Sequence, residues 1–113
     1  MAYPVESTPE FDDWMARLDD AKADAVAVVV AAFVAHADAL GAAVLKPIKT
    51  SRHQAMRELR IQTIRVLAAV DPRGIVVLLW GGDKAGLWNE WYPPAIAYAD
   101  ALYDRHLAEL KED

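Results

Sequence analysis

The 113-residue sequence contains no cysteine, only five glycines and no apolar run of membrane length. The absence of cysteine excludes disulfides, thiolate nucleophiles and cysteine-ligated zinc or iron, and it suits a reducing compartment. The longest apolar run, residues 25–35, has 11 residues, whereas a membrane-spanning helix needs roughly 20. With 55% hydrophobic and 26% charged residues, the chain is predicted to form one globular domain over residues 1–113.

Histidine is also scarce, and its positions do not suggest a metal centre. His36, His53 and His106 are scattered without the spacing of metal ligands, so we expect neither metal nor cofactor. Acidic residues precede the apolar run, whereas an export signal begins with basic residues. We therefore expect a cytoplasmic protein with no membrane partner.

Positive charge is concentrated in the middle of the chain. Lys, Arg, Asp and Glu sum to −6 over residues 1–45, to +5 over 46–84 and to −4 over 85–113, which together give the −5 of the whole chain. Such segregation indicates that one surface meets a polyanion or an acidic partner while the rest keeps the protein soluble. A functional site is therefore expected in the middle block.

The apolar pattern predicts helices towards both ends of the chain. After a short strand over residues 3–6, Ser7-Thr8-Pro9-Glu10 has the cap, first-turn proline and early acid of a helix start. A second, deeply buried helix is expected over residues 21–40, ending near Gly41 and forming a helical hairpin with the first. A last helix should begin or kink at Pro93-Pro94.

Between the helices the apolar residues alternate, which predicts an antiparallel meander. The strands are expected at residues 56–61, 64–70 and 75–80. Asp71-Pro72-Arg73-Gly74 is typical of a type I turn. The third strand should end at Gly81-Gly82-Asp83-Lys84, where Lys84 would follow flexible glycines that let backbone approach a ligand closely.

The short connection between the first two strands must be centred on Gln62 and Thr63, which places Arg60 opposite Arg65. Like charges directly opposed on adjacent strands repel, and two guanidinium groups suit a bound phosphate or carboxylate. Alternation puts Glu58 on the same face, and the Asp71 to Gly74 turn puts Val70 opposite Ile75 and Arg65 opposite Trp80. An alternative remains open, in which Glu58 neutralises the arginines in a surface ion network.

Several short motifs follow one another between residues 51 and 107: Ser51-Arg52-His53, Met56-Arg57-Glu58-Leu59-Arg60, Ile64-Arg65-Val66-Leu67, Asp71-Pro72-Arg73, Gly82-Asp83-Lys84-Ala85-Gly86, Trp88-Asn89, Trp91-Tyr92, Ala99-Asp100, Tyr103-Asp104 and His106-Leu107. Their order and spacing resemble the HigB branch of the RelE-type toxins of type II toxin-antitoxin systems. The resemblance implies a RelE-like α+β fold, in which an N-terminal helical hairpin packs on a small twisted antiparallel sheet with a C-terminal helix.

The resemblance also implies a metal-independent endoribonuclease that cleaves mRNA on the ribosome and is inhibited by a cognate antitoxin encoded beside it, expected to be a helix-turn-helix protein. In such toxins an RNA 2′-hydroxyl attacks the adjacent phosphate, which requires a base, cations and a proton donor. On this sequence Glu58 is the candidate base, and Arg60, Arg65 and Lys84 are the candidate cations, with Lys84 also a candidate acid.

The remaining candidates would bind RNA beside the scissile phosphate. Arg52, His53 and Arg57 would hold flanking phosphates, while the aromatic candidates Trp80, Trp88, Trp91 and Tyr92 would stack on bases. For Trp91 and Tyr92 the alternative is a structural role in anchoring a helix on the core. For the protein as a whole, the alternative is a catalytically inactive relative whose basic face only binds its partner protein.

Overall fold

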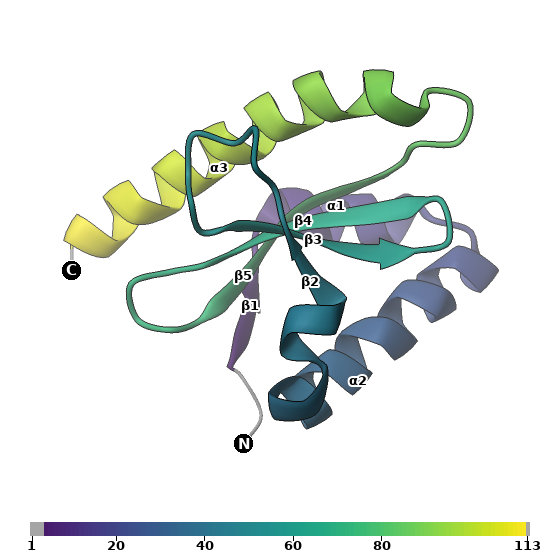
Figure 1. Cartoon of the computed structure of the whole chain (residues 1–113), viewed down its shortest axis with the longest axis horizontal. Coiled ribbons are helices and arrows are strands. Elements are labelled where there is room, and N and C mark those ends of the chain that lie inside the picture. The colour runs from purple at the N-terminus through teal and green to yellow at the C-terminus, as the bar shows by residue number, and fades with distance from the viewer. Residues whose placement is uncertain (1–3, 113) are drawn as a thin grey trace.

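The computed structural model describes residues 4–112, without the side chains of residues 36–44. It has a five-stranded sheet with helices on both faces (Figure 1). The helices are α1 (Pro9–Arg17), α2 (Asp20–Val44) and α3 (Tyr92–Glu112), and a short 3-10 helix, η1 (Trp88–Trp91), precedes α3. The strands are β1 (Val5–Ser7), β2 (Leu45–Pro47), β3 (Met56–Ile61), β4 (Ile64–Val70) and β5 (Val76–Asp83), in the order β1-β5-β4-β3-β2.

The sheet is mixed, which corrects the prediction of an antiparallel sheet. The pairs β2–β3, β3–β4 and β4–β5 are antiparallel, and β3, β4 and β5 form the predicted meander. The edge strand β1 instead pairs in parallel with β5. No hairpin joins these two strands, since two helices and the strands β2 to β4 lie between them in the chain. The direction of so short a strand therefore has no local signal in the sequence.

The predicted start of the first helix is confirmed. Thr8 is the N-cap, and its hydroxyl accepts a hydrogen bond from Phe11 N at 3.0 Å and donates one to Leu79 O at 2.6 Å. The cap thereby ties α1 to β5. The predicted helical hairpin is only partly confirmed, because α1 lies mainly against β5 whereas α2 lies against β3 and β2. The second helix also continues to Val44, beyond the predicted end near Gly41.

Arg60 and Arg65 are opposed in the sheet, as the alternation predicts. The turn consists of Gln62 and Thr63, and Gln62 takes the left-handed conformation with φ +57°. The second predicted turn is also present, since Gly74 N donates to Asp71 O at 2.9 Å.

The predicted register between β4 and β5 is wrong. Val70 lies opposite Val76, Arg65 opposite Gly82, and Trp80 opposite Leu67. The register shifts between Leu67 and Ala68, so one extra residue of β5 is accommodated in a β-bulge. A pattern of strict alternation cannot show such a bulge, because it assumes one residue opposite one residue.

Helices pack on both faces of the sheet, including the face that carries Glu58, Arg60 and Arg65. On the first face, α1 and α2 contribute Phe11, Val26 and Phe33 to a buried cluster with apolar side chains of β3 to β5. On the second, α3 contributes Ala95, Ala99, Leu102 and Tyr103 to another. Figure 1 shows α3 and α2 on opposite sides of the sheet.

The last helix begins where the two prolines predict. Its first residue is Tyr92, so Pro93 and Pro94 lie in the first turn, where their missing N–H groups cost no hydrogen bond. Within residues 4–112, no helix has the length and apolar character needed to cross a membrane. The candidate site lies on the second face, in a pocket between the β3–β4 hairpin, the start of α3 and the loop after β2.

Candidate functional site

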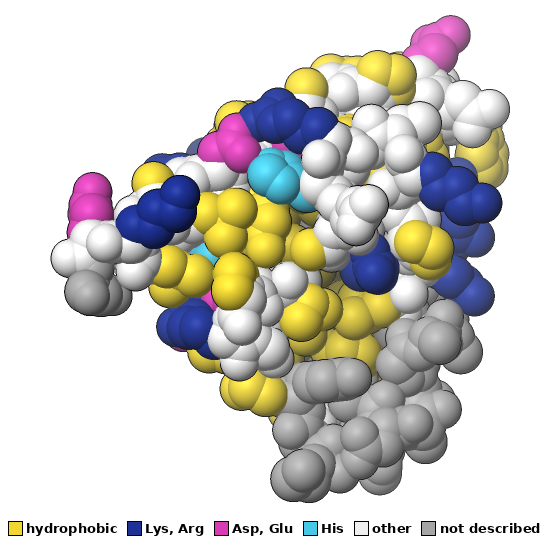
Figure 2. All heavy atoms as spheres, turned by 60° about the vertical axis from the view of Figure 1, so that its left-hand side comes forward, with side chains coloured by type: hydrophobic (Ala, Val, Ile, Leu, Met, Phe, Trp, Pro, Cys, Tyr) yellow, Lys and Arg dark blue, Asp and Glu magenta, His cyan; other side chains and the backbone are white. Residues whose placement is uncertain are grey.

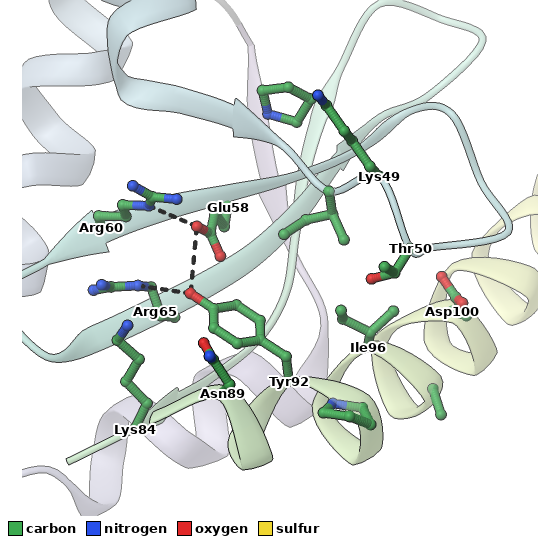
Figure 3. A pocket seen from close by; sticks show the side chains of 14 residues that line it. Lys49, Thr50, Glu58, Arg60, Arg65, Lys84, Asn89, Tyr92, Ile96 and Asp100 are labelled. Carbon is green, nitrogen blue, oxygen red and sulfur yellow. Dashed lines mark hydrogen bonds and ion pairs between the residues drawn. The ribbon is translucent and has the colours of Figure 1, made fainter. Parts of the chain in front are cut away.

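A pocket of about 750 Å³ lies between the β3–β4 hairpin, the segment after β5, the start of α3 and the loop after β2 (Figure 3). All four predicted catalytic residues line it, and Tyr92 is the only predicted RNA-binding residue that does so. The lining residues are Pro47, Ile48, Lys49, Thr50, Glu58, Arg60, Arg65, Lys84, Asn89, Tyr92, Pro93, Ile96, Ala97 and Asp100. The pocket is thus cationic at the sheet and mostly apolar along the start of α3, with Asp100 as the charged residue of this helix.

Glu58 lies at the base of the pocket and is almost fully buried, with 2% of its surface exposed. Its Oε1 atom accepts a hydrogen bond from Arg60 Nε at 2.6 Å and one from the Tyr92 hydroxyl at 3.4 Å. Among the described residues, its Oε2 atom has no hydrogen-bond partner. A buried carboxylate oxygen without a donor is costly, which is a feature found at functional sites.

Arg60 extends from the same strand, but its side chain is 56% exposed. The hydrogen bond that Arg60 donates to Glu58, and then the charge of this carboxylate, raise the pKa of Arg60 above its usual value. Arg60 therefore keeps its positive charge at the mouth of the pocket.

Arg65 is 8% exposed and is held by neutral groups. Its Nε donates to the Tyr92 hydroxyl at 3.1 Å, and its Nη1 donates to Gln62 O at 2.7 Å and to Ile64 O at 2.9 Å. No carboxylate lies within ion-pair distance of Arg65 in the described part of the chain. Its charge is consequently fixed in direction without being neutralised by a paired anion.

The Tyr92 hydroxyl joins Glu58 and Arg65 across the pocket (Figure 3). It accepts from the guanidinium and donates to the carboxylate, so its proton is directed at Glu58. Tyr92 thus orders two of the predicted catalytic side chains.

Lys84 comes directly after β5, and its ammonium group lies over two aromatic rings. The Nζ atom is 5.1 Å from the centroid of the Trp88 ring and 5.6 Å from that of Tyr92. These distances are those of cation–π interactions.

The glycines before Lys84 do not serve the role that their sequence suggests. Gly81 and Gly82 belong to β5, and a Cβ atom at these positions would lie 2.4 Å from the ring of Trp14 and 2.8 Å from Nε1 of Trp91, respectively. They are therefore small because an indole ring packs on each face of the strand, not because a ligand approaches their backbone.

Arg52 and His53 are engaged by α3 and do not line the pocket. Arg52 pairs with Asp104, and His53 Nε2 lies 2.7 Å from the same carboxylate. The His53 ring also contacts Tyr103 edge-on, at 4.8 Å between centroids. These contacts attach the loop after β2 to α3.

Arg57 lies outside the pocket as well. It alternates with Glu58 along β3, and its Nη1 donates to Gln54 O at 2.5 Å and Met56 O at 2.9 Å. In Figure 2, several Lys and Arg side chains gather along one edge of the molecule, whereas elsewhere on this face basic and acidic side chains lie together.

The three tryptophans predicted to stack on bases lie in different surroundings, and the ring of Trp91 agrees with the structural alternative. Trp91 is 6% exposed and stacks on Trp80 with centroids 6.1 Å apart, so its ring belongs to the core. Trp80 is partly buried between Trp91 and Tyr98. Trp88, by contrast, is 58% exposed beside Lys84. Of the tryptophans proposed to stack on bases, Trp88 alone has a largely free ring.

Sequence reasoning did not select several residues that line the pocket, among them Lys49, Thr50, Asn89, Ile96 and Asp100. Asp100 accepts a hydrogen bond from Ser51 Oγ at 2.5 Å and a weaker one from Arg52 N at 3.4 Å. Asn89 and Asp100 each stand in a short motif of the resemblance, which was the only signal for them. In the part of the chain described here, no group of His, Asp and Glu side chains forms a candidate metal site.

Asp71 and His106 form a second polar centre, away from the pocket. His106 Nε2 lies 2.8 Å from Asp71 Oδ2, and Arg73 donates to the same oxygen from Nη2 at 2.7 Å. Burial raises the pKa of the Asp71 carboxyl, but hydrogen bonds from His106, Arg73 and the Ile75 and Arg73 backbone outweigh burial and lower this pKa to about 2. The charged carboxylate therefore stabilises the turn before β5.

Comparison with protein families and curated proteins identifies relatives over most of the chain. The model of the family "Phage derived protein Gp49-like" matches residues 13–104. HigB2 of Mycobacterium tuberculosis is 32% identical over 104 residues, which are 88% of this chain and 52% of HigB2. HigB3 of the same organism is 33% identical over 102 residues, which are 88% of this chain and 90% of HigB3. The chain thus spans about half the length of HigB2 but nearly all of HigB3.

Solved structures with the same fold have low sequence identity to this chain. The toxin-antitoxin complex RelBE2 of M. tuberculosis aligns with a TM-score of 0.54 at 20% identity, over 74% of this chain and 99% of its own. A mutant of the E. coli toxin RelE in the free state aligns with a TM-score of 0.59 at 12% identity, over 81% and 92%. The E. coli DinJ-YafQ complex gives 0.56 at 13%, over 77% and 99%. These similarities show the fold alone.

Proposed function

Because the chain belongs to the Gp49-like family, together with HigB-type proteins, we propose that it is the toxin of a type II toxin-antitoxin system. The relatives HigB2 and HigB3 are both named as toxins, and several solved structures with this fold are complexes with an antitoxin. A cognate antitoxin is accordingly the proposed protein partner, and a helix-turn-helix protein encoded beside the toxin is the proposed form of it.

The proposed activity is endoribonucleolytic cleavage of mRNA on the ribosome. The RNA 2′-oxygen loses its proton and bonds to the adjacent phosphorus, while the bond from phosphorus to the 5′-oxygen breaks and this oxygen takes up a proton. The product carries a 2′,3′-cyclic phosphate, and no water is consumed in this step. The reaction needs a base, a cationic environment for the phosphate oxygens and a proton donor for the leaving 5′-oxygen. The proposed base is Glu58, and Lys84 is the proposed proton donor.

The observation that carries the proposal is a carboxylate with an unpartnered oxygen placed among Arg60, Arg65 and Lys84 in one pocket. Arg65, already directed by Tyr92 and backbone carbonyls, would bind the scissile phosphate without rearrangement. Arg60 is exposed and would turn from Glu58 to the phosphate, which frees the carboxylate to accept the 2′-hydroxyl proton. Lys84 would stabilise the charge that develops on the phosphate oxygens.

The contacts to the rest of the RNA follow from what the pocket exposes. Tyr92 would stack on a base next to the scissile phosphate, and Lys49 would contact a flanking phosphate. Arg52, His53 and Arg57 would reach phosphates only outside the pocket, because their side chains already bind α3 or backbone carbonyls.

The test expresses the protein without its antitoxin and measures growth arrest and mRNA cleavage. Arg65→Ala and Lys84→Ala are each expected to lower the cleavage rate by about 10² to 10³, the usual effect of removing one preorganised donor. Arg17→Ala and Lys111→Ala remove exposed cations outside the pocket and should leave the rate unchanged. A wild-type protein that binds the antitoxin but neither arrests growth nor cuts RNA would contradict the enzymatic proposal.

A second candidate function is supported by the burial of Glu58. Since Glu58 is paired with Arg60 at 2.6 Å, it is also suited to be a structural counter-ion on a face that only binds the partner protein. The variant Glu58→Gln separates the two functions. A catalytic base predicts a loss of cleavage of at least 10²-fold with RNA binding retained, whereas a counter-ion alone predicts that both change together or not at all. Glu109→Gln, on the exposed side of α3, is the control.

A further inference from the structure

Lys84 reaches the pocket without a carboxylate partner in the described part of the chain. The adjacent Asp83 does not pair with it, because its carboxylate accepts a hydrogen bond from Ala85 N at 2.9 Å and lies 3.4 Å from Lys22 Nζ. The ammonium instead lies over the rings of Trp88 and Tyr92. A flexible lysine side chain is therefore oriented by neutral aromatic faces alone.

The conformation of Trp88 is unusual for an exposed residue. Its φ is +50°, in the left-handed region that bulky side chains rarely adopt, yet 58% of its surface remains exposed. Burial of the indole ring does not compensate for this backbone conformation. Backbone strain at an exposed aromatic residue beside a pocket is an observation that favours a functional role.

Backbone hydrogen bonds show how the strained residue comes to face Lys84. The carbonyl of Lys84 accepts hydrogen bonds from Leu87 N at 2.9 Å and from Trp88 N at 2.8 Å, so the chain folds back on itself over residues 84–88. Gly86 lies within this turn and has φ +83°. The turn brings the indole ring of Trp88 to 5.1 Å from Lys84 Nζ. No carboxylate pairs with this ammonium group among residues 4–112.

We propose that Trp88 is a positioning residue, which together with Tyr92 holds the Lys84 ammonium at the pocket without neutralising its charge. A carboxylate in the place of Trp88 would orient the lysine equally well, but it would compete with a phosphate for the same ammonium. An aromatic face also attracts the ammonium group, but it repels a phosphate less than a carboxylate does. The lysine therefore stays available to an anionic substrate. The consequence for RNA cleavage rests on the proposed function, whereas the orientation of Lys84 does not.

The orientation is tested first, by the NMR signals of the Lys84 side chain in the full-length protein. Ring currents of the two aromatic residues should shift the Lys84 Hε signals upfield in the wild type. Trp88→Leu should remove a large part of this shift, and Trp88→Phe, which retains an aromatic face, should preserve most of it. Leu87→Ala, a change at the exposed neighbour, is the matched control and should leave the signals in place. Lys84 signals that are the same in wild type and Trp88→Leu would overturn the proposal.

The effect on catalysis is tested with a short single-stranded RNA substrate. Trp88→Leu should lower kcat/KM about fivefold, the effect of losing one cation–π interaction, and Trp88→Phe should recover most of the loss. In a Lys84→Met background, Trp88→Leu should have no further effect, because its role acts through Lys84. A full, additional fivefold loss in that background would show that Trp88 acts on RNA directly and would overturn the positioning role.

A change to glycine separates positioning from folding. Trp88→Gly relieves the left-handed conformation, so its thermal midpoint should equal or exceed that of the wild type while kcat/KM falls. A midpoint that drops with the activity would instead indicate a structural role and contradict the proposal. If the wild type cleaves no RNA, the proposed function fails, and the NMR comparison still decides whether Trp88 orients Lys84.

Discussion

At the scale of single residues, Asp71 shows how one buried carboxylate couples folding to pH. Its side chain is fully buried, and His106, Arg73 and two backbone N–H groups direct hydrogen bonds at it. These donors favour the charged form so strongly that the pKa falls from 3.8 to about 2 in the folded state. The turn before β5 is therefore stabilised by an ionised group.

We predict that Asp71 contributes about 2 kcal/mol to the free energy of unfolding at neutral pH. Because the folded-state pKa is lowered, this contribution is fully present above pH 3.8 and is lost as the pH falls towards 2. Urea denaturation of wild type and Asp71→Asn at pH 7 and at pH 2.5 measures it. The variant should be less stable at pH 7, and the difference should shrink at pH 2.5.

The matched control for Asp71 is Asp13→Asn, which removes a carboxylate exposed on α1 and paired only with Arg17 among the residues described. An exposed pair of this kind contributes little, so the two proteins should unfold alike at both pH values. An equal stability difference between wild type and Asp71→Asn at pH 7 and pH 2.5 would contradict the role assigned to the ionised carboxylate.

At the scale of elements, the end of β5 is the strand segment on which both layers of helices converge. Trp14 from α1 lies against Gly81 on one face, and Trp91 lies against Gly82 on the other. The two indole rings occupy the space that side chains at Gly81 and Gly82 would fill. The end of β5 is therefore packed between both helix layers, directly before the segment that carries Lys84.

We predict that Gly82→Ala destabilises the fold by about 1 to 3 kcal/mol through overpacking. The added Cβ would lie 2.8 Å from Nε1 of Trp91, whose ring is buried and cannot move away. Thermal unfolding monitored by tryptophan fluorescence provides the measurement. Gly74→Asn is the control, because no atom lies within 4 Å of its Cβ and Asn tolerates φ +81°. Equal midpoints for wild type and Gly82→Ala would contradict the close packing.

Some strand pairings could be predicted from the sequence, and others could not. The opposition of Arg60 and Arg65 was predictable, because two apolar runs separated by Gln62 and Thr63 allow one turn centre. The pairing of Trp80 with Leu67 could not be predicted, because a β-bulge next to Leu67 shifts the register without leaving a signal in the composition of either strand. The three-residue strand β2 is likewise too short to have a recognisable period. For β1 the sequence indicates a strand near residues 3–6 but not its parallel pairing with β5.

The candidate site likewise has residues whose positions could be predicted from the sequence and residues whose positions could not. Glu58, Arg60, Arg65 and Lys84 were predictable, because strand alternation and a strand end place them. The pocket walls from α3 were not, because alternation says which face a residue takes but not which helix covers that face. The same reason explains Trp91, which α3 and β5 enclose, and His53, which Asp104 of α3 binds.

At the scale of the whole molecule, the charge segregation seen along the chain is retained in part. Several cations of the middle block, Arg52, Arg60 and Arg73, are paired with carboxylates. Arg65 and Lys84, which line the pocket, have no such partner among the residues that the structure describes. A chain of net charge −5 therefore still places two cations without a carboxylate partner at one pocket.

This distribution predicts the salt dependence of RNA binding. If Arg60, Arg65 and Lys84 each neutralise one phosphate, the slope of log K against log salt should be about −2 for single-stranded RNA, from about −0.7 per phosphate. Fluorescence anisotropy with a labelled non-cleavable RNA between 50 and 200 mM salt, roughly the range in which such slopes are resolved, measures it. Lys84→Ala should reduce the slope by about 0.7, and Lys111→Ala should leave it unchanged because Lys111 lies exposed in the last turn of α3. Equal slopes for wild type and Lys84→Ala would show that RNA, if bound at all, is bound elsewhere than at this pocket.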